Sequence, residues 1–109
     1  METRVVNLTP HTINVVCGVE VAIPASGTVA RCREISTPVG EVNGIPIVTK
    51  TFGEVVDLPE PQEDTIYIVS ALVAAAAVKA GRLDVVSPGD LVRDADGKII
   101  GCASFCRPA

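Results

Sequence analysis

The sequence predicts a single α+β domain spanning residues 1–109, mainly antiparallel β-sheet with one principal buried helix. Three observations favour this class. Val, Ile and Leu dominate a core that has few aromatic residues, which is typical of strands. Only residues 71–80 combine high helix propensity with clear start and stop signals. The dipeptide Asn43-Gly44 is the sequence best suited to a tight hairpin turn.

The N-terminal third contains four short β-prone runs. Residues 4–8 and 12–16 lie on either side of Pro10, which cannot donate to a strand ladder and forces a bend. Residues 19–23 and 28–35 follow, each after a glycine-containing turn. We expect these runs to pair as an antiparallel meander.

The middle of the chain carries the clearest hairpin signal. Residues 39–42 and 45–52 flank Asn43-Gly44, which accommodates the two positive φ angles of a type I′ turn. Residues 53–58 predict another short strand, and an acidic, proline-punctuated loop then leads to the next element. We expect that loop to be exposed.

The one convincing helix follows directly after a strand. Residues 65–69 are a β-branched and aromatic run, Ser70 is a good N-cap, and residues 71–80 are rich in alanine. Gly81 supplies a C-terminal stop.

Beyond the helix, residues 83–86 and 90–93 are short β-like pieces separated by a Ser-Pro-Gly tripeptide. The last predicted hairpin joins residues 91–94 to residues 98–105. Its connecting turn contains Gly97, which suits a type I turn closed by a bulge.

The junction between strand and helix has two interpretations. The free backbone N–H groups of Ala71 and Leu72, with the positive end of the helix dipole, make the corner at Ser70 and Ala71 suitable for an anion. A helix with so few polar side chains is also simply expected to be core, and apolar helices are common. Its uncharged run, residues 65–78, is shorter than the roughly 18 residues that cross a bilayer, so we predict no membrane span.

The composition of the chain indicates which kinds of partner it can bind. Hydrophobic residues make up 48% of the chain and the mean hydropathy is +0.42, although aromatic residues are only 3%. We expect other copies of the chain to cover some of this apolar surface, in a homo-oligomer. The net charge of −4 argues against nonspecific binding to duplex nucleic acid. A small anionic ligand needs only two or three cations, for which Arg82, Arg93 and Arg107 are available.

The cysteines Cys17, Cys32, Cys102 and Cys106 fit three states: reduced core thiols, two disulfides, or a zinc site. No C-x-x-C pair occurs, and because charged and strand-like sequence follows Met1 we expect no signal peptide. On one strand, Cys102 and Cys106 would lie about 13 Å apart, which is too far for a disulfide. We therefore expect reduced, mostly buried thiols and a cytoplasmic protein.

Catalysis and metal binding have little support. The only histidine, His11, lacks a third orienting group if paired with Cys17 or Cys32. The segment Asp94-Ala95-Asp96-Gly97 lacks the other acidic ligands of a calcium loop, and no glycine-rich phosphate loop occurs. We predict no catalytic residue, no metal and no cofactor.

A bound nucleotide needs a flat partner for its base, donors for its phosphates and acceptors for its ribose hydroxyls. The aromatic candidates for the base are Phe52, Tyr67 and Phe105, although Tyr67, like Phe52, also fits a core position. The candidates for a phosphate are Arg93, Arg82 and Arg107, and those for a sugar are Asp94 and Asn43. The full set of predicted ligand-binding residues is Ser70, Ala71, Arg93, Asp94, Phe105, Phe52 and His11. Simpler interpretations remain open: a core position for Phe52 and a solvated turn for Arg93 and Asp94.

Three blocks of sequence belong together: Asn7-Leu8-Thr9-Pro10-His11, residues 52–70 (FGEVVDLPEPQEDTIYIVS) and residues 92–102 (VRDADGKIIGC). As a set they resemble the Thoeris anti-defence family, short and mostly phage-borne proteins that sequester cyclic ADP-ribose signals. The blocks are spread over nearly the whole chain.

The resemblance implies a non-enzymatic protein that binds glycocyclic ADP-ribose tightly, in the cytoplasm of an infected bacterium, and deprives an effector of its activating signal. It also implies a homo-oligomer with ligand at the subunit interface. Some members hold cyclic oligonucleotides at separate sites. The resemblance assigns no contact residues, so the candidates above come from chemistry and position.

Two other classes fit the sequence. One is a small structural or interaction module of phage origin with no nucleotide ligand. The other is a small hydrolase or lyase that uses His11. Recovery of intact ligand from the denatured protein would distinguish a sponge from an enzyme, and the absence of any thermal shift with nucleotides would favour the module.

Overall fold

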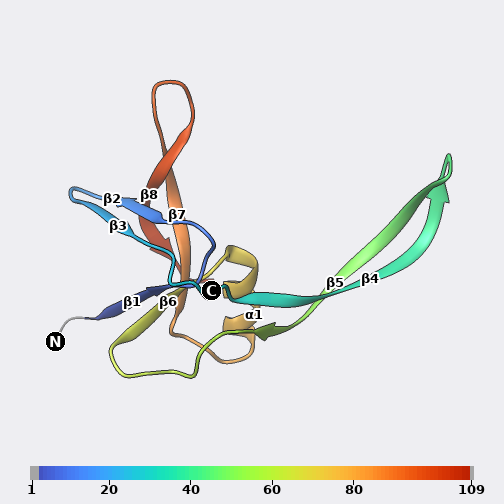
Figure 1. Cartoon of the computed structure of the whole chain (residues 1–109), viewed down its shortest axis with the longest axis horizontal. Coiled ribbons are helices and arrows are strands. Elements are labelled where there is room, and N and C mark those ends of the chain that lie inside the picture. Colours follow the sequence, from blue (N-terminus) through green and yellow to red (C-terminus); the bar gives the residue numbers. More distant parts are fainter. Residues whose placement is uncertain (1–2, 109) are drawn as a thin grey trace.

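The computed structural model describes residues 3–108, and over that range it contains eight strands and one helix (Figure 1). In chain order these are β1 (Arg4–Asn7), β2 (Ile13–Val16), β3 (Glu20–Ile23), β4 (Arg31–Val42), β5 (Ile45–Val56), β6 (Thr65–Ile68), α1 (Ala71–Lys79), β7 (Val85–Arg93) and β8 (Ile99–Cys106). The predicted α+β class is confirmed, because strands predominate around a single principal helix.

Six strands form one sheet in the order β1-β6-β7-β8-β2-β3. The pairs β2–β3 and β7–β8 are antiparallel. The predicted meander is wrong for β1, which pairs in parallel with β6, and β2 pairs in parallel with β8. The meander is wrong for its fourth run as well, because β4 pairs with β5 in a separate sheet. The strands β6 and β7 are parallel to each other because the helix α1 forms a crossover connection between them.

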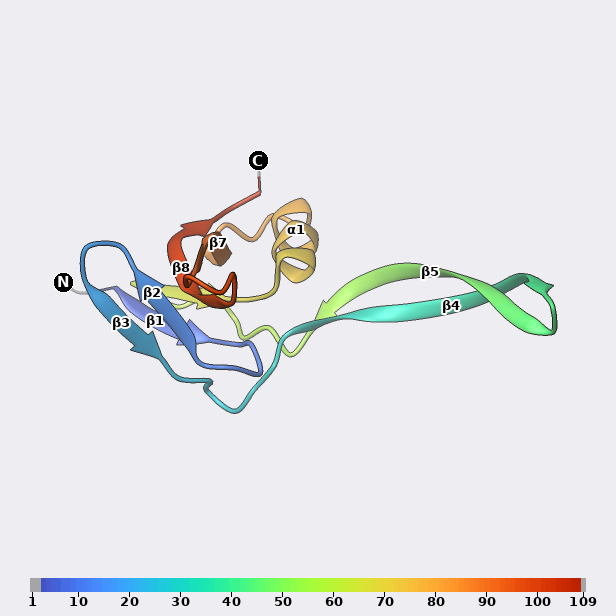
Figure 2. The ribbon, with the colours of Figure 1, turned by 90° about the horizontal axis from the view of Figure 1, so that it is seen from above.

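Asn7, at the end of β1, ties the two edges of this sheet together. Its side chain is 1% exposed. The Nδ2 group donates to the carbonyl of Ile23 at the end of β3 at 2.9 Å, and the Asn7 carbonyl accepts from the N–H of Ser26 at 3.0 Å. The sheet therefore curls until β1 and β3 approach each other (Figure 2).

The helix α1 begins and ends where the sequence predicts. Ser70 is the N-cap, and Gly81 follows the helix with a φ of 94°. Only one face of α1 is buried, through Val73, Ala74 and Ala77, and the opposite face carries Leu72 at 47% exposure. The expected buried helix is thus buried on one side. Its buried face packs on a core formed by Leu8, Ala30, Tyr67, Val69 and Val85.

The strands β4 and β5 form a separate two-stranded ribbon, termed the arm, that projects far from the six-stranded sheet (Figure 2). Asn43 and Gly44 make its tip with φ angles of 51° and 79°, so the predicted hairpin turn is confirmed. The division into four shorter strands is wrong, because each strand of the arm is 12 residues long. Register shifts within β4, at Cys32/Glu34 and at Pro38/Gly40, let the ribbon continue through residues that resemble strand breaks.

The arm makes the molecule unusually long. The radius of gyration is 16.6 Å, whereas a compact domain of this length has roughly 13 Å. The overall extents are 55 × 40 × 27 Å.

The strand β7 also continues through a predicted break. Gly89 lies so close to β8 that an added Cβ would meet Ser104 Oγ at 2.8 Å. The next residue, Asp90, has a φ of 43°, and its carboxylate accepts a hydrogen bond from Ser104 at 2.8 Å. These contacts hold the Ser-Pro-Gly segment within the β7–β8 hairpin, whose turn contains Gly97 at a φ of 81°.

All four cysteines are free thiols. The expectation that most are buried is wrong: Cys102 is buried and Cys32 partly so, while Cys17 and Cys106 are exposed. The exposed pair lies at the ends of β2 and β8, where the strands leave the sheet. Within residues 3–108, no helix has the length and apolar character needed to cross a membrane.

Candidate functional site

A cleft of about 360 Å³ opens where the arm joins the rest of the molecule, and we term it the arm-root cleft. Its lining comes from the loop after β1, the segment that enters β4, the first turn of α1, and β5. Two predicted ligand residues, Ser70 and Phe52, lie in it together. Phe52 belongs to β5 and Ser70 is the N-cap of α1, so the two residues come from different elements, 18 positions apart in the sequence.

Ser70 gives the arm-root cleft a polar end. Its Oγ accepts a hydrogen bond from the N–H of Val73 at 3.3 Å, as an N-cap does. The N–H groups of Ala71 and Leu72 precede the first bonded turn and have no partner within the helix. No acidic side chain lies in that turn, so the helix itself does not offset the positive end of its dipole. This end suits an anion.

The same cleft has an apolar wall. Phe52 is 49% exposed, and Leu72 and Val29 are 47% and 38% exposed. The interpretation of Phe52 as a core residue is therefore wrong: the ring lies on the arm, outside the packed core. An exposed aromatic ring beside two exposed aliphatic side chains is a surface on which a flat ligand can stack.

A cation completes the lining. Arg31 lies in the cleft, and its Nη2 is 3.8 Å from the carboxylate of Asp57, with both side chains largely exposed. Such an exposed pair is weak, so Arg31 remains available to a ligand. Arg31 is not among the ligand residues predicted from the sequence. Glu34, also in the lining, hydrogen-bonds to Lys50 at 2.8 Å, which raises the pKa of that lysine.

An aromatic ring, a cation and the N-terminal end of α1 thus line one depression, and the predicted ligand residue Ala71, next to Ser70 in the chain, is not part of the lining. No protein-family model, curated protein or solved structure matches this chain. The arm-root cleft is therefore interpreted from its own chemistry.

The other predicted residues lie elsewhere. His11 lines a second cleft, of about 400 Å³, together with Cys102 rather than with Cys17 or Cys32. Burial raises the pKa of the Cys102 thiol, which disfavours the thiolate that nucleophilic chemistry needs.

Arg93 and Asp94 are engaged in their own turn. Arg93 Nη1 donates to the carbonyl of Gly97 at 2.9 Å, and Asp94 Oδ1 accepts from the N–H groups of Asp96 and Lys98 at 2.9 and 3.0 Å. This turn forms the tip of the β7–β8 hairpin, which points away from the arm (Figure 1). Phe105 lies opposite Pro88 at the other end of that hairpin and is 38% exposed.

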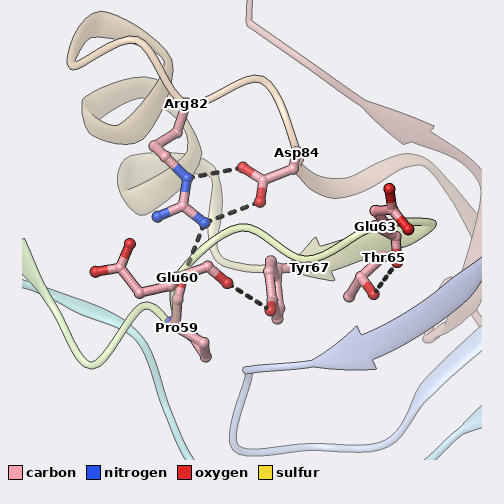
Figure 3. Close-up of polar contacts among 7 residues, drawn as sticks. All are labelled: Pro59, Glu60, Glu63, Thr65, Tyr67, Arg82 and Asp84. Atoms are coloured by element: carbon pink, nitrogen blue, oxygen red, sulfur yellow. Dashed lines mark hydrogen bonds and ion pairs between the residues drawn. The ribbon is translucent and has the colours of Figure 1, made fainter.

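Arg82, considered as a phosphate ligand, has a structural function. It makes a bidentate pair with Asp84 at 2.9 and 2.8 Å and donates to the carbonyl of Pro59 at 2.8 Å (Figure 3). The hydroxyl of Tyr67 donates to the carbonyl of Glu60 at 3.1 Å. These bonds fasten the acidic loop to β6 and to the segment after α1.

Two of the three sequence blocks grouped in the sequence analysis have structural explanations. In the first, Asn7 and Thr9 organise the turn that leads to His11. In the third, Asp94 and Gly97 close a hairpin. Phe52 and Ser70, the first and last residues of the middle block, are those that meet in the arm-root cleft.

Proposed function

We propose that this protein is a phage anti-defence sponge, which binds a small cyclic nucleotide of the cyclic ADP-ribose type in the bacterial cytoplasm and sequesters it unchanged. The single observation that supports this proposal is the arm-root cleft, where Phe52, Arg31 and the N-cap Ser70 of α1 line one depression.

The chemistry of the cleft matches the parts of such a ligand. A purine base stacks on Phe52, which is half-exposed and held on a strand. A phosphate group accepts hydrogen bonds from the N–H groups of Ala71 and Leu72 at the positive end of the helix. Arg31 adds a charge-assisted hydrogen bond to the same phosphates. Sequestration depends on such fixed donors and stacking surfaces rather than on stabilising a transition state.

The size of the cleft favours a site shared between subunits. At about 360 Å³, the arm-root cleft is at the small end of pockets for drug-sized ligands, roughly 300–1,000 Å³. A ligand of the cyclic ADP-ribose type would therefore project from one subunit. A homo-oligomer with ligand at the subunit interface encloses the remainder, as the resemblance implies.

A second candidate function has an observation in its favour. The arm exposes large aliphatic side chains, among them Ile45 at 64% and Val39 at 62%. Surfaces of this kind mark protein–protein contacts. An interaction module that binds no nucleotide would need only this surface.

Calorimetry with a panel of cyclic ADP-ribose isomers and cyclic di- and trinucleotides tests the proposal. Saturable binding of one ligand class is expected, with a thermal stabilisation of about 2.7 kcal/mol at a hundredfold excess over Kd. The bound ligand is then released by denaturing the protein, and its molecular mass is measured by mass spectrometry. An unaltered mass supports sequestration, a hydrolysed or rearranged product indicates an enzyme, and no heat with any member indicates the interaction module.

A further inference from the structure

The arm carries different chemistry on its two faces. Along β5, alternate residues share a face, and the register assigns their partners on β4. One face, termed the uncharged face, carries Ile35, Thr37, Val42, Ile45, Ile47 and Thr49. The opposite face, termed the charged face, carries the ion pair between Glu34 and Lys50 at 2.8 Å.

The uncharged face is exposed to a degree that a single chain does not explain. Ile35, Val42, Ile45 and Ile47 are 54%, 53%, 64% and 45% exposed. In residues 3–108, β4 and β5 form a two-stranded sheet that no third strand joins. A two-stranded ribbon is at best marginally stable in water unless something packs on its apolar face. The arm therefore needs a cover from outside its own chain.

We infer that a second copy of this chain supplies the cover, with the two arms packed face to face through their uncharged faces. The face matches itself, because contact between two copies of it brings no like charges together. The charged face then remains in solvent, where the pair between Glu34 and Lys50 keeps its hydration. A two-fold arrangement of this kind buries the same residues on both copies.

The shape of the molecule determines the relative direction of the arms. Packed sheets lie about 10 Å apart, whereas the molecule is 27 Å across even along its shortest axis. The rest of the chain extends to both sides of the line of the arm in both views (Figures 1 and 2). Two parallel arms would force these bodies into the same space. The arms are therefore antiparallel, with Val42 and Ile45 at the tip of one arm over Ile35 of the other.

The length of the arm indicates a modest interface. Twelve residues per strand span about 40 Å, and two strands about 10 Å, which gives roughly 400 Å² of flat area on each copy. Standard interfaces bury about 800 Å² of accessible surface on each partner. The contact is thus smaller than a standard interface, so we expect a weak association that depends on protein concentration.

Sedimentation equilibrium of the full chain over a concentration series tests the inference, without any nucleotide, so the outcome is independent of the proposed function. The wild type is expected to reach twice the monomer mass of 11.3 kDa, or an even multiple of it. Ile47→Lys places a charge on the uncharged face and is expected to leave the monomer. Val48→Lys is the matched control: the two positions are adjacent and 45% and 43% exposed, but Val48 lies on the charged face. This control is expected to keep the wild-type mass.

A mixing experiment tests the antiparallel register. In that register Ile47 of one copy lies over Thr37 and Thr49 of the other. A mixture of Ile47→Lys and Thr49→Glu chains is therefore expected to form heterodimers more readily than either variant self-associates. Circular dichroism confirms that each variant is folded, and Thr37→Glu replaces Thr49→Glu if that variant is not. A monomeric wild type at every concentration, or equal dissociation by Val48→Lys and Ile47→Lys, would overturn the inference, and no heterodimer would overturn the register.

Discussion

Asn7 and Thr9 are joined by two hydrogen bonds to the same atom. Asn7 Oδ1 accepts from the N–H of Thr9 at 2.9 Å and from its hydroxyl at 2.6 Å. The other end of the Asn7 amide donates to the carbonyls of His11 and Ile23 at 2.8 and 2.9 Å. One buried side chain therefore holds the end of β1, the turn after it and the end of β3.

Replacing Asn7 tests how much that side chain contributes. Asn7→Ala removes four hydrogen bonds made by a side chain that is itself 1% exposed, so the free energy of unfolding is expected to fall by about 3 kcal/mol. Urea denaturation measures the change. Asn14→Ala, at an exposed position of β2, is expected to change stability by about 0.5 kcal/mol or less. Equal losses in the two variants would contradict the assignment.

Gly101 allows β2 to approach β8. A Cβ at this position would lie 2.6 Å from the backbone oxygen of Asn14, closer than real contacts permit. Gly101→Ala is expected to push β2 away from β8 and to cost about 1–3 kcal/mol of stability, with faster hydrogen exchange in β2 and β3. Gly53→Ala is the control, because an added Cβ there meets its nearest atom at 3.6 Å. Unchanged exchange in Gly101→Ala would show that the approach is not required.

The pair between Arg82 and Asp84 makes stability depend on pH. Its hydrogen bonds lower the pKa of the Asp84 carboxyl below the ordinary value of 3.8. A carboxyl with a lower pKa in the folded chain contributes stability that is present above the unfolded pKa and is lost as pH falls through the folded pKa.

Asp84→Asn is therefore expected to be less stable than the wild type near neutral pH, and to lose less stability between about pH 5 and pH 2. Arg82→Met removes the other half of the pair and is expected to flatten the acid limb in the same way. Denaturant midpoints collected across this range give both curves. If all three proteins give parallel curves, the pair does not contribute to the pH dependence.

Substitution of two phenylalanines tests whether a nucleotide binds in the arm-root cleft or elsewhere on the surface. Phe52→Ala is expected to weaken nucleotide binding roughly 5- to 150-fold, because the stacking of a base on an aromatic ring contributes about 1–3 kcal/mol. Phe105→Ala removes a ring that is also partly exposed, at 38%, but lies on β8, and is expected to leave Kd unchanged. Calorimetry on both variants distinguishes them, and the opposite ranking would move the site to β8.

Local signals in the sequence predicted local structure well. Ser70, Gly81 and the Asn43-Gly44 turn each act within a few residues, and the structure has the helix and the hairpin that they predict. Strand order depends on contacts between distant segments, and the prediction that the first four strands pair as an antiparallel meander was wrong for that reason. The missed signal was the β-branched run on each side of the helix, which is the pattern of a parallel strand–helix–strand unit.

The candidate site was only partly predictable for a similar reason. Arg93 and Asp94 have suitable chemistry, but their hydrogen-bonding groups serve a local turn. Phe52 and Ser70 come together only because the root of the arm lies beside the first turn of α1. That juxtaposition, and with it the position of Arg31, depends on the tertiary fold.

The parallel pairing of β1 with β6 also has a consequence for how the chain folds. Arg4 pairs with Thr65, so a loop of about sixty residues must close before the first edge of the sheet exists, and such long closures slow folding. The arm lies within that loop and is built from neighbours in sequence, so its hairpin forms early and draws the two distant segments toward each other.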